Sequence, residues 1–274
     1  MTDKTALGDR MKLYERAEAG RRFMPLLPIC ARIDGKRFSR WTKGLARPYD
    51  ERLSATMVAV TQALVEDTHA RVGYTQSDEI SLVFYSESAD SQVFLDGRVQ
   101  KLTSILASMA TARFNTEARA RVPERADAPA LFDCRCWTVP NLDEAANALL
   151  WRERDATKNS LSMAARSHYS HAQLDGKRGP DMHEMLHAAG VNWNDYPSFF
   201  KRGTFVRRER VSRPFSTEEL ERLPPRHAAR ANPDLVIERT VVRAVDMPPL
   251  NRIRNRVAAL FEGAEPELFE ADPA

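Results

Sequence analysis

The chain has 274 residues, 43% of them hydrophobic and 29% charged, which predicts a soluble globular protein of one large domain or slightly more. It has no apolar run of the ~20 residues that cross a bilayer and no apolar segment of a secretory signal near its start, so we expect a cytoplasmic protein without a membrane partner. Three cysteines are too few for a disulfide framework, and no Cys–His cluster completes a zinc site.

The net charge of +3 is unevenly distributed along the chain. Residues 262–274 contain five acidic side chains and no Lys or Arg, so the rest of the chain carries +8. A basic body suits a polyanionic partner, although a solvated surface with an acidic tail would explain the same distribution.

The first half of the chain predicts alternating strands and helices. Hydrophobic side chains alternate with period two at 28–34, within 71–85 and at 131–139, which predicts strands. They recur at helical spacing in 48–70, 98–116 and 140–155, which predicts helices. This order predicts the α+β class, with a ferredoxin-like sheet and helices on one face.

The second half is less regular and supplies a smaller extension of helices and strands. We expect a loop at 174–181, strands near 199–211 and 238–245, and a terminal helix within 248–263. These patterns divide the chain into residues 1–140 as the domain of the predicted sheet, 141–260 as a helical and basic part, and 261–274 as an acidic tail expected to be disordered.

Two aspartates stand at strand ends that the predicted sheet brings together. Asp34 ends the first strand, and Asp78 lies in the turn that joins the next two. The first and third strands of a ferredoxin-like sheet are neighbours, so these carboxylates can converge and share a cation such as Mg²⁺. Two such ions ~3.5–4 Å apart can orient a nucleophile and stabilise a leaving pyrophosphate. Solvated turns are the alternative reading of both segments.

The ordered segments RIDGKRF, RPYDERLSATM, YTQSDEISLVF, FDCR, LLWRERDATKNS and FFKRGTFV resemble the tRNA-His guanylyltransferase family. Its members are nucleotide polymerases that work in the 3′-to-5′ direction. The resemblance covers roughly residues 25–210, and it implies a catalytic domain similar to a polymerase palm.

The resemblance also implies roles for individual residues. Two Mg²⁺ ions would be bound by Asp34, the carbonyl of Gly35, and Asp78. Glu79 would support catalysis, with a plain surface carboxylate as the alternative. The nucleotide would be bound by the metal-binding positions together with Lys36, Arg37, Phe38, Ser39, Arg47 and Ser77.

The implied reaction has two nucleotidyl steps and a tRNA substrate. The 5′-monophosphate of tRNA is first activated by ATP or GTP, and the 3′-hydroxyl of an incoming nucleoside triphosphate then attacks the activated end. The residues expected to contact tRNA are Arg98, Lys101, Arg135, Arg152, Asn159, Lys201 and Arg202. Each of them could instead be a solvated side chain. The family commonly forms homotetramers, and we expect one here.

Two departures from the family pattern bear on the substrate. Arg47 stands where the eukaryotic enzymes usually have a lysine, and residues 156–160 retain Asn159 but lack the histidine of the enzymes that act on histidine tRNA. The chain is thus more similar to the bacterial and archaeal "like-protein" branch, which is associated with repair of 5′-truncated tRNAs. A nucleotidyl cyclase and an inactive tRNA-binding protein are the alternatives.

Overall fold

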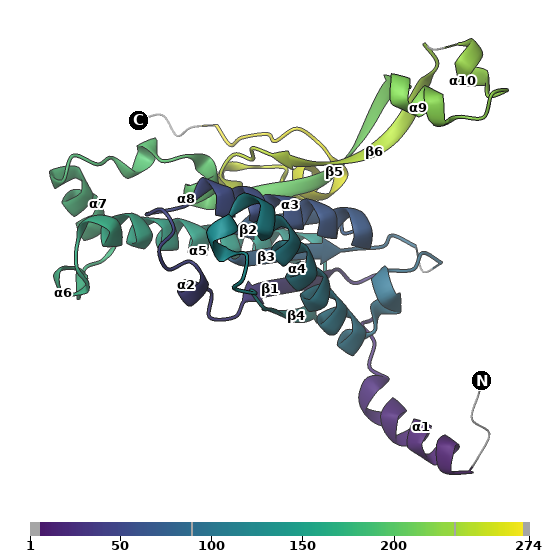
Figure 1. Ribbon diagram of the computed structural model, residues 1–274, viewed down its shortest axis with the longest axis horizontal. Helices are drawn as coiled ribbons and strands as arrows, with labels where there is room; N and C mark the ends of the chain where they lie inside the picture. Colours follow the sequence, from purple (N-terminus) through teal and green to yellow (C-terminus); the bar gives the residue numbers. More distant parts are fainter. Residues whose placement is uncertain (1–5, 89, 233, 271–274) are drawn as a thin grey trace.

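The computed structural model describes residues 6–88, 90–232 and 234–270. Its centre is a six-stranded antiparallel sheet with the strand order β4-β1-β3-β2-β5-β6 (Figure 1). The strands are β1 Ile29–Gly35, β2 Val72–Gln76, β3 Glu79–Phe84, β4 Phe132–Thr138, β5 Thr204–Pro214 and β6 Val236–Val245. The predicted α+β class and the central β1–β3 pair are therefore confirmed.

Two long helices cover one face of this sheet. They are α3 Glu51–Thr68 and α4 Val99–Arg121. Their apolar stripes pack on the β1 side chains Ile29, Ala31 and Ile33, which alternate toward this face. The prediction of helices on one face holds for these two crossover helices.

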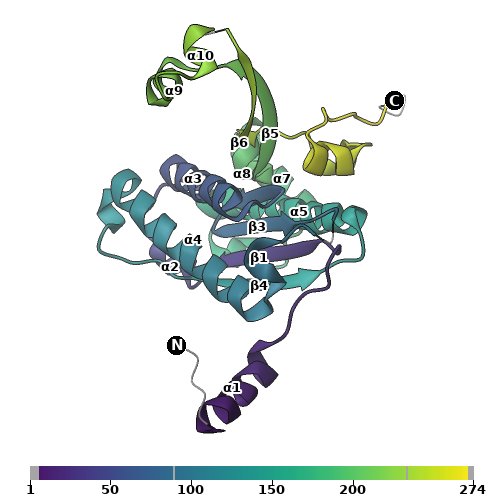
Figure 2. The same ribbon diagram turned by 90° about the vertical axis from the view of Figure 1, so that its right-hand side faces the viewer.

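The third long helix lies on the opposite face, which corrects the one-face arrangement expected for all helices (Figure 2). This helix, α5 Leu142–His168, is a single 27-residue element that begins at an Asn141 cap. Leu149 and neighbouring α5 side chains pack against Cys30 of β1 and Val83 of β3. Apolar residues thus project from both faces of the sheet centre, and each face requires cover.

The remaining α-helices of the described residues are shorter. They are α1 Ala6–Ala19, α2 Phe38–Trp41, α6 His171–Leu174, α7 Gly179–Ala188, α8 Ser198–Arg202, α9 Thr217–Arg222 and α10 Ala228–Ala231. The β5–β6 hairpin extends away from the body and carries α9 and α10 at its end (Figure 1). Within the described ranges, no helix combines the length and apolar character needed to span a membrane.

The C-terminal segment departs from two expectations. The single helix expected within 248–263 is replaced by a 3₁₀ turn at Leu250–Arg252 and a π-helical turn at Ala258–Glu262. Residues 261–270, expected to be disordered, instead contact the preceding part of the same segment: Arg254 forms an ion pair with Glu267 at 2.6 Å, and the N–H of Phe269 donates to the Arg252 carbonyl at 2.9 Å. Residues 271–274 of the acidic tail lie outside the described residues.

A buried carboxyl group joins α5 to this segment. Glu153 is 3% exposed, and its Oε2 accepts a hydrogen bond from the N–H of Leu250 at 2.9 Å. Its Oε1 is buried without a hydrogen-bond partner among the described residues. Burial raises the pKa of Glu153 from 4.5 to about 7, against the smaller opposing effects of the Leu250 N–H, Arg202 and Arg154.

The substitution Glu153→Gln should therefore stabilise the protein at alkaline pH. The folded state holds the Glu153 proton up to a higher pH than the unfolded state, so its stabilising contribution is lost as the pH rises through about 7. Glutamine keeps the acceptor for Leu250 without a charge. We expect the gain in free energy of unfolding to be small near pH 5 and to reach about 3 kcal/mol at pH 8, measured by urea denaturation. A pH-independent gain, or an equal gain for the exposed control Glu184→Gln, would contradict this.

Candidate active site

The ends of β1 and β3 bring the two predicted aspartates together. Asp34 lies directly opposite Glu79 in the antiparallel register, and the N–H of Gly35 donates to the carbonyl oxygen of Asp78 at 3.2 Å. A Cβ atom added to Gly35 would lie 2.9 Å from Oδ2 of Asp78. Only a residue without a side chain allows the backbone to approach this carboxylate so closely. The expected convergence of these strand ends is therefore observed.

The electrostatics of these carboxylates favour a bound cation. Burial, followed by repulsion from Asp34, raises the pKa of Asp78 to about 6. Burial, followed by repulsion from Asp133, raises the pKa of Asp34. Over the residues that the structure describes, no group of three or more His, Cys, Asp or Glu side chains has the geometry of a metal site. A cation here would thus depend on Asp34, Asp78 and the backbone of Gly35, all of them oxygen donors that suit Mg²⁺.

Two hollows meet at this pair. One, of about 440 Å³, is lined by residues that include Asp34, Glu79 and Asn159. The other, of about 380 Å³, is lined by residues that include Ser39 and Arg47. Both hollows share three lining residues, namely Ser77, Asp78 and Met163. Of the sequence-predicted nucleotide contacts, Phe38, Ser39, Arg47, Ser77 and Asp78 therefore line one hollow.

The two cations after Gly35 lie at the surface of the bend. Lys36 and Arg37 are exposed, and the N–H of Lys36 donates to the Leu131 carbonyl at 2.8 Å. Arg37 has a left-handed backbone conformation with φ 53°, which starts α2. Phe38 turns inward and packs against Trp41 and Phe114. The bend thus separates the buried Phe38 from two exposed cations, and neither cation lines one of the two hollows.

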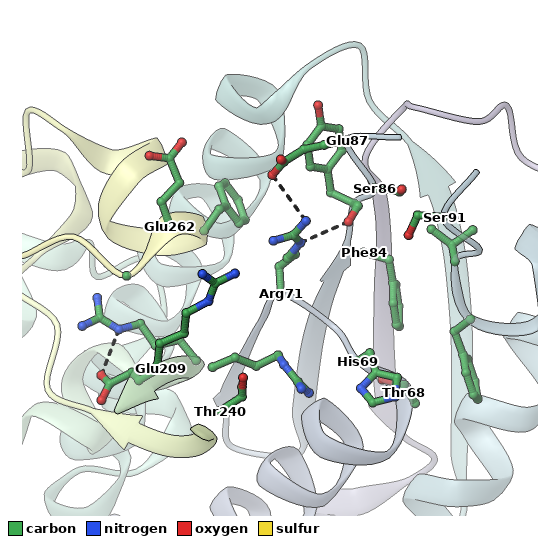
Figure 3. Close-up of a pocket in the computed structure, with 18 of the residues that line it drawn as sticks. Thr68, His69, Arg71, Phe84, Ser86, Glu87, Ser91, Glu209, Thr240 and Glu262 are labelled. Carbon is green, nitrogen blue, oxygen red and sulfur yellow. Dashed lines mark hydrogen bonds and ion pairs between the residues drawn. The ribbon is translucent and has the colours of Figure 1, made fainter. Parts of the chain in front are cut away.

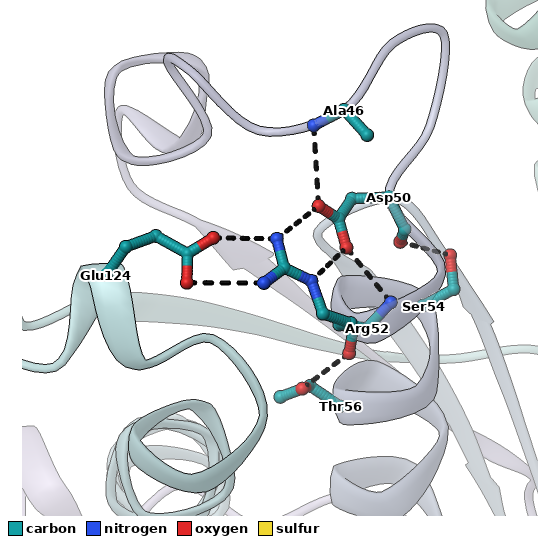
Figure 4. A network of polar contacts seen from close by, with 6 residues as sticks. All are labelled: Ala46, Asp50, Arg52, Ser54, Thr56 and Glu124. Carbon is teal, nitrogen blue, oxygen red and sulfur yellow. Dashed lines mark hydrogen bonds and ion pairs between the residues drawn. The ribbon is translucent and has the colours of Figure 1, made fainter.

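A polar network fixes the loop that carries Arg47 (Figure 4). Asp50 caps α3 and also accepts a hydrogen bond from the N–H of Ala46 at 3.4 Å. Arg52 bridges Asp50 to Glu124: its Nη2 donates to Oδ2 of Asp50 at 2.8 Å and to Oε1 of Glu124 at 2.7 Å. The Arg52 hydrogen bond lowers the pKa of Asp50, so the cap stays ionised. The network therefore joins the loop to the end of α4.

Glu79 is a buried partner of α5. Its side chain accepts two hydrogen bonds from Arg152, at 2.6 Å from Nε and 2.7 Å from Nη2. Arg152 also donates to Asp155 at 2.9 Å. Glu79 is 8% exposed, which excludes the plain surface carboxylate. Arg152, expected to contact tRNA, has its guanidinium bound to these two carboxylates, and its tRNA contact stays a prediction.

The substitution Arg152→Ala is expected to lower the free energy of unfolding by about 3–5 kcal/mol, because it leaves Glu79 buried without its partner. Urea denaturation measures the change. The neighbouring exposed Arg154→Ala serves as the control and should change stability by less than about 0.5 kcal/mol. The combined variant Arg152→Met with Glu79→Gln should recover much of the loss, and equal losses for the single and combined variants would contradict the pair.

The other expected tRNA contacts do not form one cluster. Asn159 lines the hollow with Asp34, whereas Arg98 and Lys101 line a separate groove between α1 and α4. Lys201 donates to the Asn194 carbonyl, and Arg202 is half-buried. Arg135 is exposed on β4 near Asp133. Their roles in tRNA binding remain predictions.

Sequence reasoning missed Arg32, Trp151 and Asp133. Arg32 lies on the Asp34 face of β1, with Nε 4.0 Å from Glu79. Asp133 is directly opposite Asp34 in the β1–β4 register. The period-two alternation of β1 already places Arg32 on the Asp34 face, without indicating a role for it, and the same alternation in β4 could have placed Asp133 there.

A larger hollow of about 930 Å³ is separate from the aspartate pair (Figure 3). Two ion pairs lie within this hollow: Arg71 is 3.4 Å from Glu87, and Arg207 is 3.1 Å from Glu209. It shares no lining residue with the hollows at Asp78. The convergent carboxylates make the smaller hollows the better candidate for chemistry.

Comparisons with known proteins agree with the geometry. A family model described as tRNAHis guanylyltransferase matches residues 8–140. A solved bacterial tRNA(His) guanylyltransferase (Thg1)-like protein in complex with ATP is 38% identical, with 74% of this chain and 88% of that chain covered and a TM-score of 0.70. A second solved bacterial tRNA(His) guanylyltransferase (Thg1)-like protein, in complex with GTP, is 31% identical. The match covers 90% of this chain and 94% of that chain, with a TM-score of 0.70.

A curated relative extends the likeness to a eukaryote. The tRNA(His) guanylyltransferase of Schizosaccharomyces pombe is 29% identical over 76% of this chain and 83% of its own length. Together with the matched residues 8–140 and the 38% identity to a solved relative, the convergent strand ends lead to one conclusion: this chain belongs to the tRNAHis guanylyltransferase family of nucleotidyltransferases.

Proposed function

We propose that the chain adds nucleotides to the 5′ end of tRNA in the 3′-to-5′ direction, with Mg²⁺ as cofactor and ATP or GTP as the activating nucleotide. The observation that carries the proposal is the approach of Asp78 to the side-chain-free backbone of Gly35 beside Asp34. The solved relatives in complex with ATP and GTP support the choice of nucleotides.

The metal fits the residues present. Asp34, Asp78 and the Gly35 carbonyl would hold two Mg²⁺ ions, which when bound neutralise phosphate charge and lower the pKa of a reacting hydroxyl. Asp78 is ionised above about pH 6, because its pKa is raised to about 6. The Arg152 pair holds Glu79 against α5 and so fixes the strand residue that follows Asp78.

The remaining residues bind and orient the substrates. Lys36 and Arg37 are exposed residues that follow Gly35 in the chain, and we propose that they contact phosphate oxygens; Arg47 lines one hollow from the loop held by Asp50. Ser77 lines both hollows and can donate its hydroxyl to a phosphate on either side. In-line displacement at phosphorus needs mainly such positioning and charge stabilisation, with no protein nucleophile.

We further propose that repair of shortened tRNA is the activity of this chain. The support is the absence of the family's histidine in residues 156–160, which retain an asparagine at Asn159. A homotetramer is proposed from the resemblance alone, and the mass of the protein in solution tests it.

The proposed activity is tested by incubation with labelled nucleotides, Mg²⁺ and two tRNAs, one intact and one lacking its 5′ nucleotide. Preferential extension of the shortened tRNA is expected. Extension of the intact tRNA alone would favour guanylylation over repair. Binding of tRNA without any incorporation would favour the inactive binder, and a cyclic nucleotide formed without tRNA would favour the cyclase.

A further inference from the structure

An exposed tryptophan stands beside the candidate active site. Trp151 belongs to α5 and immediately precedes Arg152, which lines the hollow with Asp34 and Asp78. The residue is 52% exposed, although a tryptophan usually buries most of its large apolar surface. The indole thus contacts Arg152, a residue that lines the hollow of the proposed metal site.

Two arginines hold the indole. The guanidinium carbon of Arg152 lies 4.6 Å from the centroid of the Trp151 ring, and that of Arg32 lies 5.5 Å away. Both arginines also face Glu79: Arg152 is bound to it, and Nε of Arg32 lies 4.0 Å from it. These contacts limit the motion of the ring, so little side-chain entropy remains to be lost when a ligand contacts it.

Positive charge lies next to the indole. Arg135 lies directly opposite Arg32 in the β1–β4 register; its side chain is 55% exposed, and its guanidinium lies 3.7 Å from the carboxylate of Asp133. Nε of Arg32 has no hydrogen-bond partner among the residues described. An aromatic ring with neighbouring cations matches a nucleotide, whose base stacks while its phosphate is paired with charge.

We propose that Trp151 is a stacking platform for a nucleobase of the substrate, with Arg135 positioned for an adjacent phosphate. This proposal rests on the proposed function. The stacked base could belong to a nucleotide near the 5′ end of tRNA or to a free nucleoside triphosphate. The other explanation is that the indole only shields the Arg152–Glu79 pair from water.

The test compares Trp151→Phe, which keeps an aromatic face, with Trp151→Leu, which keeps apolar packing without one. Dissociation constants are measured without catalysis for 5′-monophosphorylated tRNA, intact and shortened, and separately for ATP and GTP. Trp151→Leu should bind one class of ligand about 5- to 100-fold more weakly, while Trp151→Phe should stay within about 3-fold of the unmodified protein. Weakened tRNA binding assigns the base to tRNA, and weakened ATP or GTP binding assigns it to the nucleotide.

The matched control is Phe269→Leu, an equally exposed aromatic residue in the C-terminal segment, which should leave all constants unchanged. If Trp151→Phe and Trp151→Leu weaken ligand binding equally, the indole serves only packing and the proposal is overturned. Unchanged ligand binding in Trp151→Leu would also overturn it. The proposed function fails separately, through absence of incorporation by the unmodified chain.

A second measurement does not depend on the folding of Trp151→Leu. A base stacked on Trp151 should quench its fluorescence, so saturating ligand should quench the unmodified protein and quench Trp151→Phe distinctly less. Equal quenching of the two proteins at saturation would overturn the proposal.

Discussion

Replacing Asp78 with alanine is expected to lower nucleotide incorporation about a thousandfold or more while leaving tRNA affinity within about twofold. Asp78 supplies one of the two carboxylates at the joined ends of β1 and β3, and its loss removes a charge that no other side chain in the hollow replaces at that point. Incorporation is measured with labelled nucleotide and shortened tRNA, and affinity by filter binding.

The control for this prediction is Asp67→Ala, an exposed carboxylate in the last turn of α3. A further variant, Asp78→Asn, separates chemistry from folding. The raised pKa of Asp78 means that its ionised form is disfavoured in the folded protein, so the neutral amide should not lower stability at pH 8. Activity that survives in Asp78→Ala would show that the metal assignment is wrong.

Gly35→Ala should reduce incorporation about a hundredfold, the effect of displacing a reacting group by roughly 1 Å. The new Cβ would lie 2.6 Å from a ring carbon of Phe38 and 2.9 Å from the Asp78 carboxylate, so at least one of them must move. Phe38 is packed in the core, and we expect the crowding to cost about 1–3 kcal/mol of folding free energy.

Gly179→Ala is the matched control, because the nearest atom to its new Cβ is a Leu161 carbon at an ordinary 3.8 Å. It should preserve both stability and incorporation. Wild-type incorporation in Gly35→Ala would mean that the close approach of backbone and carboxylate has no part in the reaction.

The convergence of Asp34 and Asp78 could be predicted because it follows from two local patterns and one topological rule. Alternating hydrophobic residues define β1 and β3, and a split βαβ arrangement makes them neighbours. The turn and strand end then place the carboxylates without any knowledge of side-chain packing.

The Arg152–Glu79 pair could not be predicted from the same patterns. It depends on which face of the sheet α5 covers, and that choice is set by packing with the C-terminal segment as well as with β1 and β3. A partial signal exists: Arg152 and Glu153 fall on the helical stripe of Leu149 and Ala156, where charged residues need buried partners.

Composition alone also misjudged residues 261–270. Their acidic side chains suggested a solvated tail, but Glu267 has Arg254 as a partner and the Glu265 carbonyl accepts from Asn255. Those partners lie only 10 to 13 positions away in sequence and become neighbours through a chain reversal that periodicity does not reveal.

Ser77, Asp78 and Met163 line both hollows of the candidate active site. A ligand that fixes the charge or rotamer of Asp78 from one hollow necessarily changes what a ligand in the other hollow encounters. Thermodynamic linkage makes this influence mutual, so each occupant should alter the affinity of the other by the same factor. Two-ligand titrations of this protein should therefore deviate from independent binding.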